Sequence, residues 1–162
     1  MSATPAALTA IATLLSVPVL LSAKGDTVRI AITGGDLSTP IEIVDPAVTS
    51  HFQVWAGPGT SSNETHSLNV DWSRGTVDPP KGLPFYEVSF VTTRQNPGTY
   101  AVRYAVDPST KQGYVYIPGK MDAEYQDNVW LIYHGVEGHW FHAWAEWEKI
   151  ANPLIAKART TR

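Results

Sequence analysis

Residues 134–142 hold the densest group of potential metal ligands in the chain: His134, Glu137, His139 and His142. Imidazole nitrogens and carboxylate oxygens are the ligands that zinc, copper and iron take when no thiolate is available. The chain has no cysteine, so a transition-metal site would have to be built from such groups. One hypothesis is therefore a site for one divalent transition metal, in a metal-binding protein or a metal-dependent enzyme.

Local geometry limits this hypothesis. A four-residue turn between His134 and His139 would place them opposite each other on paired strands, with His142 on the other face. An early helix would instead bring His139 and His142 to one face, at i and i+3. Because neither geometry gathers all three histidines, a metal would also need His51 or His66. The sequence favours boundary histidines, whose rings pack on aromatics while their nitrogens bond to water or backbone.

The loop after Trp55 is the second candidate site. Residues 57–67 are polar turn formers without apolar periodicity, and loops of this length are commonly functional. Trp55 falls on the polar side of a predicted strand, where an exposed indole could stack on a sugar or anchor a protein. We therefore propose a ligand site of Trp55, Thr60, Asn63 and His66, with a carbohydrate or an envelope protein as partner. The alternative is that these aromatic rings belong to the core.

Composition and motifs argue against several functional classes. The net charge is −3, with 12 basic and 15 acidic residues, so a nucleic-acid partner is not expected. The chain contains no phosphate-binding glycine loop, no dinucleotide motif, no GxSxG and no HExxH. We assign no catalytic residue and no cofactor apart from the alternative metal. The sequence favours a non-catalytic binding or structural module.

The N-terminal segment differs from the rest of the chain. Residues 6–23 carry no charge, and Lys24 is the first charged side chain. An apolar run that ends in small residues is typical of a secretory signal peptide, here residues 1–23 with cleavage near Ala23. The absence of disulfides then favours a bacterial envelope, with the domain secreted or periplasmic. If the segment is retained, the protein is an N-terminally membrane-anchored interaction protein. The uncharged run over residues 6–23 barely reaches the length of about 20 apolar residues that a membrane span needs.

From residue 24 onward, strand patterns dominate. Apolar and polar residues alternate, the period of a half-buried strand, over residues 28–32, 41–43, 52–56, 68–72, 86–92, 100–106 and 113–117. Turn sequences at 96–98 and 107–110 predict that the last three strands form an antiparallel meander. With a further apolar strand over 128–133, we expect an all-β, antiparallel β-sandwich of immunoglobulin-like architecture and about eight strands.

The C-terminal region predicts a helix. Four apolar residues follow the i, i+4, i+7, i+11 spacing of an amphipathic helix that starts near Ala143: Trp140, Trp144, Trp147 and Ala151. Pro153 should interrupt or restart it. We therefore expect one domain over residues 24–156, closed by this short helix, and a frayed tail over residues 157–162.

Overall fold

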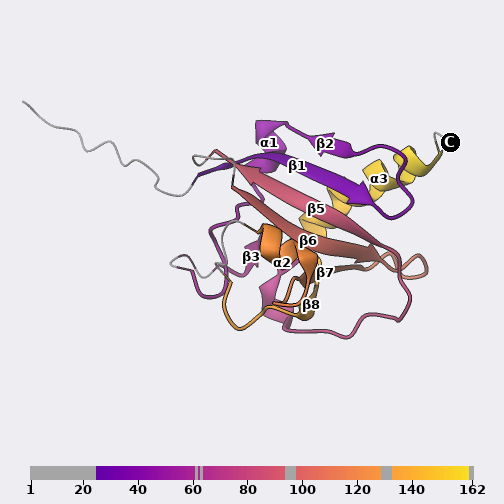
Figure 1. Ribbon diagram of the computed structural model, residues 1–162. Helices are drawn as coiled ribbons and strands as arrows, with labels where there is room; N and C mark the ends of the chain where they lie inside the picture. The colour runs from indigo at the N-terminus through magenta and orange to yellow at the C-terminus, as the bar shows by residue number, and fades with distance from the viewer. Residues whose placement is uncertain (1–24, 61, 63, 94–97, 129–132, 161–162) are drawn as a thin grey trace, which may run out of the picture.

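A six-stranded antiparallel β-sheet forms the centre of the protein (Figure 1). The structure, a computed structural model, describes residues 25–60, 62, 64–93, 98–128 and 133–160. The strand order is β2-β1-β5-β6-β7-β8. These strands are β1 (Thr27–Gly34), β2 (Ile41–Ile43), β5 (Phe85–Thr92), β6 (Thr99–Val106), β7 (Gly113–Ile117) and β8 (His139–His142).

The predicted meander is confirmed. The strands β5 and β6 pair as an antiparallel hairpin with Val88 opposite Val102, and β7 continues it with Val115 opposite Tyr104. All four side chains are fully buried, as the alternation of apolar and polar residues predicts for one face of a sheet. The strands β1 and β2 also form where the alternation predicts them.

The immunoglobulin-like sandwich is not confirmed. In the described part of the chain, the only other sheet is a two-stranded hairpin of β3 (His66–Ser67) and β4 (Val70–Asp71). The inner face of the large sheet is covered instead by the helix α3 (Ala145–Thr160) and by loops, among them the segment after α1 (Pro46–Thr49). The prediction of a strand at 52–56 is wrong, because that segment forms turns and bends. The fold is thus mostly β, with one main sheet and a C-terminal helix.

Trp147 is the centre of the core between α3 and the sheet. It is fully buried, and its ring lies 5.4 Å from Phe52, 6.2 Å from Phe90 and 5.8 Å from Tyr104, measured between ring centroids. Ala151 and Ile155 follow at i+4 and i+8 and are also buried, so one stripe of the helix faces the sheet. The predicted helix is confirmed from Ala145 onward.

The ends of α3 differ from the prediction. Trp140 belongs to β8, and Trp144 directly precedes the helix. At the other end the helix continues past Pro153 to Thr160, so residues 157–160, which we expected to be a frayed tail, are helical. Tertiary contacts with the sheet hold the helix together across the proline, which removes one backbone hydrogen bond.

Two predicted segments lie outside the described residues. One is the signal peptide or anchor at residues 1–23, and the other is most of the strand expected at 128–133. Of that strand, Asn128 caps the helix α2 (Ala123–Asp127), and Tyr133 is buried in a loop. None of the helices that the structure describes is long and apolar enough to cross a membrane.

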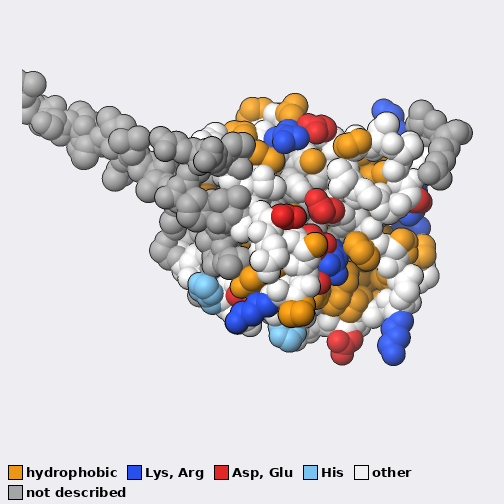
Figure 2. All heavy atoms as spheres, viewed as in Figure 1, with side chains coloured by type: hydrophobic (Ala, Val, Ile, Leu, Met, Phe, Trp, Pro, Cys, Tyr) orange, Lys and Arg blue, Asp and Glu red, His pale blue; other side chains and the backbone are white. Residues whose placement is uncertain are grey.

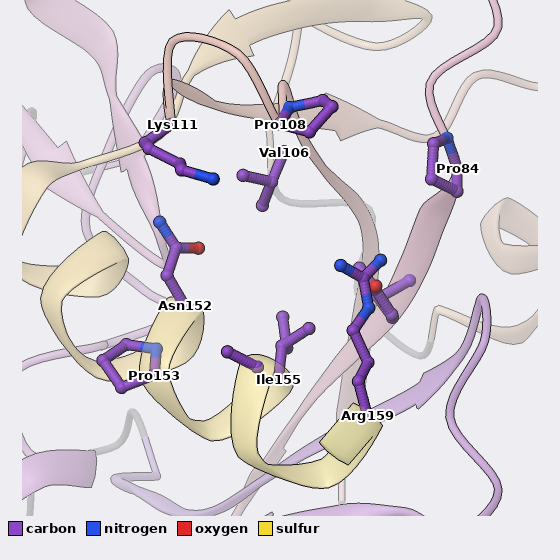
Figure 3. A pocket seen from close by; sticks show the side chains of 10 residues that line it. Pro84, Val106, Pro108, Lys111, Asn152, Pro153, Ile155 and Arg159 are labelled. Carbon is purple, nitrogen blue, oxygen red and sulfur yellow. The ribbon is translucent and has the colours of Figure 1, made fainter. Parts of the chain in front are cut away.

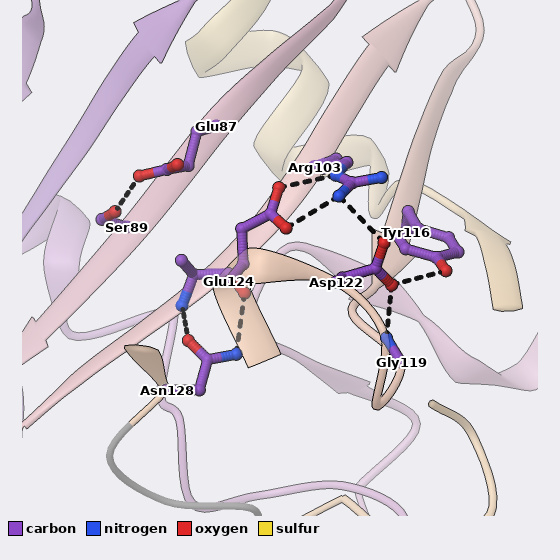
Figure 4. A network of polar contacts seen from close by, with 9 residues as sticks. Glu87, Ser89, Arg103, Tyr116, Gly119, Asp122, Glu124 and Asn128 are labelled. Atoms are coloured by element: carbon purple, nitrogen blue, oxygen red, sulfur yellow. Dashed lines mark hydrogen bonds and ion pairs between the residues drawn. The ribbon is translucent and has the colours of Figure 1, made fainter. Parts of the chain in front are cut away.

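Arg103 organises the outer face of the sheet (Figure 4). Its guanidinium group donates hydrogen bonds of 2.6 and 2.7 Å to the two carboxylate oxygens of Glu124, and one of 3.0 Å to Asp122. The same group lies 5.2 Å from the ring centroids of Phe85 and Tyr116, as in a cation–π contact. These contacts fasten α2 to β6 on the face of the sheet that is turned toward the viewer in Figure 2.

Replacing Arg103 with methionine should therefore loosen α2. We expect R103M to lower the free energy of unfolding by about 1 to 3 kcal/mol, because a bidentate, partly buried ion pair is lost and two carboxylates then face each other. The matched control is R29M. Arg29 makes one hydrogen bond of 3.0 Å to Glu42, and both side chains are about half exposed, so this variant should lower the free energy of unfolding by less than about 1 kcal/mol. Urea unfolding followed by circular dichroism measures both variants, and equal losses would contradict this role for Arg103.

Candidate functional site

The structure does not gather the predicted metal ligands. His139 and His142 lie at the two ends of β8, opposite Ile117 and Tyr114 of β7. Residues three apart along a strand point to opposite faces of the sheet, so their imidazoles diverge. Both predicted geometries are therefore wrong: His139 is not paired with His134, and it does not lie on a helix with His142.

Glu137 is used to close a turn. Its carboxylate accepts hydrogen bonds from the backbone N–H groups of Gly135, at 2.7 Å, and Val136, at 3.1 Å. The Nδ1 atom of His134 lies 3.7 Å from this carboxylate, and the His134 side chain is 72% exposed. Across the described residues, which include all five histidines, no three His, Asp or Glu side chains are arranged to hold a metal ion.

The predicted ligand site after Trp55 is also dispersed. Trp55 is only 9% exposed, and its indole N–H donates a 2.8 Å hydrogen bond to the carbonyl of Gly25, so the ring packs in the core and is not an open platform. Thr60 closes its own loop by hydrogen bonds with both backbone groups of Gly57. Asn63 lies outside the described residues.

His66 does line a surface hollow. Together with His51, Gln53 and Glu64 it faces an open, polar depression of about 540 Å³. The His66 ring is stacked on Trp144, with centroids 5.0 Å apart, and its Nε2 atom lies 3.5 Å from Asp71. Because His66 covers one face of Trp144 and Phe52 meets the ring edge to face, most of this aromatic surface is used within the protein.

A more enclosed cavity lies between α3 and the ends of β5 and β6 (Figure 3). We call it the α3 cavity; its volume is about 350 Å³. Most of its lining is apolar, with three polar side chains at its margin. The residues that line it are Pro84, Tyr86, Val106, Pro108, Lys111, Asn152, Pro153, Ile155, Ala156 and Arg159.

One wall of the α3 cavity is fixed by a salt bridge. Arg159 of α3 bonds to both carboxylate oxygens of Asp36, at 2.9 and 2.7 Å, and the Tyr86 hydroxyl donates a 2.8 Å hydrogen bond to the same group. Gly35 permits this approach, because at its φ of 58° a Cβ atom would come within 2.5 Å of the Tyr86 ring. The turn after β1 thereby ties the end of α3 to the sheet.

The electrostatics keep this wall in one protonation state near neutral pH. Hydrogen bonds from Arg159 and Tyr86 hold the pKa of Asp36 below its ordinary value, so this carboxylate stays ionised. Burial, with the hydrogen bond to Asp36, raises the pKa of Tyr86 to about 12, so the phenol stays a neutral donor. The Arg159 charge is consequently compensated within the protein.

The opposite margin carries Lys111 and Asn152. The Tyr104 hydroxyl donates a 2.7 Å hydrogen bond to the Oδ1 atom of Asn152, and this oxygen lies on the cavity side of the amide in Figure 3. The Lys111 side chain extends over the cavity from the turn between β6 and β7 (Figure 3). The lining is mostly apolar with a few polar side chains at its margin, an arrangement suited to binding a small ligand.

The α3 cavity was not predicted from the sequence. Three of its lining residues are prolines, and these mark only breaks in secondary structure. Its walls come from segments that begin at residue 84 and end at residue 159, so no local spacing could bring them together.

Comparisons of the chain with protein-family models, with curated proteins and with solved structures give no match.

Proposed function

We propose that this protein is a non-catalytic binding module that takes a small apolar ligand in the α3 cavity. The cavity carries the proposal: ligand pockets commonly enclose about 300 to 1,000 Å³, are mostly apolar, and contain a few polar groups that orient the ligand. The α3 cavity, at about 350 Å³, has each of these properties. The predicted site after Trp55 gives weaker support, because Trp55 is buried, Thr60 is engaged in its own loop, and the hollow beside His66 is polar and open to solvent.

We also propose that the domain is exported. The uncharged run at residues 6–23 supports this location, as does a chain that needs no reduced cysteine. In the envelope or outside the cell, a module of this kind would bind a small molecule, whereas the carbohydrate partner suggested by an exposed Trp55 loses its main support.

Filling the cavity tests the proposal. Ala156 lines the cavity, so A156F should place a phenyl ring inside it and weaken the binding of the neutral dye Nile red by at least about tenfold. The matched control is A145F, the same change at an exposed first residue of the same helix that does not line the cavity. Dye fluorescence titrations measure binding, and circular dichroism checks that both variants fold. Binding that is absent from the wild type, or unchanged in A156F, would refute the proposed function.

A further inference from the structure

We propose that the α3 cavity selects an organic anion, a monocarboxylate on an apolar body, with the carboxylate held by Lys111. This inference rests on the proposed function, because it names the class of ligand for the same cavity. It goes beyond it by assigning a charge to the ligand and a role to Lys111.

One charged group lies at the free margin of the cavity. The Lys111 ammonium group has no hydrogen-bond or ion-pair partner among the described residues, and Figure 3 shows it extending over the cavity. The Oδ1 atom of Asn152 accepts the Tyr104 hydrogen bond, so this amide is engaged within the protein and Lys111 supplies the charge. A cationic donor beside an apolar cavity is complementary to a carboxylate on an apolar body.

The backbone at Lys111 supports a role for its side chain. Lys111 has a φ of 65°, one of two non-glycine residues with positive φ in the described chain. Glycine suits this left-handed conformation best, because a Cβ atom lies close to the following carbonyl oxygen there, a cost that lysine bears and glycine does not. The Lys111 N–H donates a 2.8 Å hydrogen bond to the carbonyl of Asp107, which fixes the turn and holds the lysine at the cavity margin. A strained lysine in a position suited to glycine is a feature of functional sites.

The remaining lining determines the rest of the ligand. The apolar side chains of Val106 and Ile155, with three prolines, can cover a hydrocarbon or ring system. Arg159 lies across the cavity, but its charge is compensated by Asp36 at 2.7 Å. One uncompensated cation therefore remains for the ligand, which favours a single negative charge over a dicarboxylate.

A matched pair of probes tests this selectivity. Octanoate and octan-1-ol share the same chain and differ in the head group, and isothermal titration calorimetry measures the affinity of each for the full-length protein. We expect octanoate to bind about tenfold more tightly than octan-1-ol, and K111M to remove this difference by weakening octanoate alone. The control K120M removes an exposed lysine that does not line the cavity and should leave both affinities unchanged. Raising the salt concentration to about 0.5 M should weaken octanoate binding only.

The outcomes separate the two proposals. If Nile red binds in a manner that A156F abolishes, but octanoate binds no more tightly than octan-1-ol, the cavity is a binding site and the proposed charge selectivity is wrong. Equal weakening of both probes by K111M would also contradict the selectivity, because it would assign the lysine a general structural role. If neither the dye nor either probe binds, the proposed function itself fails.

Discussion

Replacing Trp147 with alanine is expected to lower the free energy of unfolding by about 3 to 5 kcal/mol. Trp147 is fully buried, and it meets aromatic rings of a loop and two strands at once: Phe52, Phe90 and Tyr104. Its removal leaves a cavity between α3 and the sheet that rigid neighbours can only partly fill. Because small domains are stable by only about 5 to 15 kcal/mol, W147A should be close to unfolding at physiological temperature.

Two further variants isolate the cause of this loss. The indole N–H of Trp147 is buried and has no hydrogen-bond partner among the described residues, so W147F removes an unsatisfied donor while keeping most of the apolar volume. W147F should therefore lower the free energy of unfolding by less than about 2 kcal/mol. The variant W140A removes a partly exposed indole from the outer face and should lower the free energy of unfolding by less than W147A does. Urea unfolding followed by far-ultraviolet circular dichroism measures all three, and a W147A loss no larger than that of W140A would contradict the central role of Trp147.

The meander could be predicted because its determinants are local. Along β5 and β6, residues such as Val88 and Val102 alternate with polar neighbours, and a turn sequence between the strands fixes their pairing. The same alternation led to a wrong prediction of a strand at residues 52–56. Phe52 and Val54 are fully buried there, as predicted, but the segment folds as turns against α3 instead of pairing in a sheet. Alternation reports burial, and pairing requires a partner strand that the local sequence does not specify.

The histidines show a similar limit. Sequence spacing placed His139 next to His134 or on a helix with His142, whereas β8 pairs with β7 and separates all three. This pairing depends on contacts between segments more than twenty residues apart along the chain, such as Val115 opposite Phe141. The α3 cavity is still less predictable from local patterns, because Lys111 and Asn152 come to line the same cavity only after the helix has packed on the sheet. Local chemistry therefore identified candidate residue types, and long-range packing decided which of them share a site.

Asn128 provides the second large expected effect, because its side chain replaces a missing strand. Continuing the register of β6 and β7 would place Pro118 opposite Ala101, and proline has no N–H to donate to the ladder. The Asn128 amide takes this position instead (Figure 4): its Oδ1 atom accepts a 2.6 Å hydrogen bond from the Ala101 N–H, and its Nδ2 atom donates one of 3.1 Å to the Ala101 carbonyl. Both residues are buried, so water does not substitute for these bonds.

We expect N128A to lower the free energy of unfolding by about 2 to 4 kcal/mol, because a buried backbone donor and a buried acceptor each lose their partner. The matched control is N69A: Asn69 is fully buried, but neither of its side-chain polar atoms has a hydrogen-bond partner in the described chain, so this variant should be nearly neutral. In N128D the carboxylate would face the Ala101 carbonyl, and this loss should shrink as the pH falls and the acid becomes a donor. Urea unfolding at pH 4 and pH 7, with hydrogen exchange at the Ala101 amide, measures these effects. Equal losses in N128A and N69A would show that burial alone, and not the bridged backbone, makes Asn128 important.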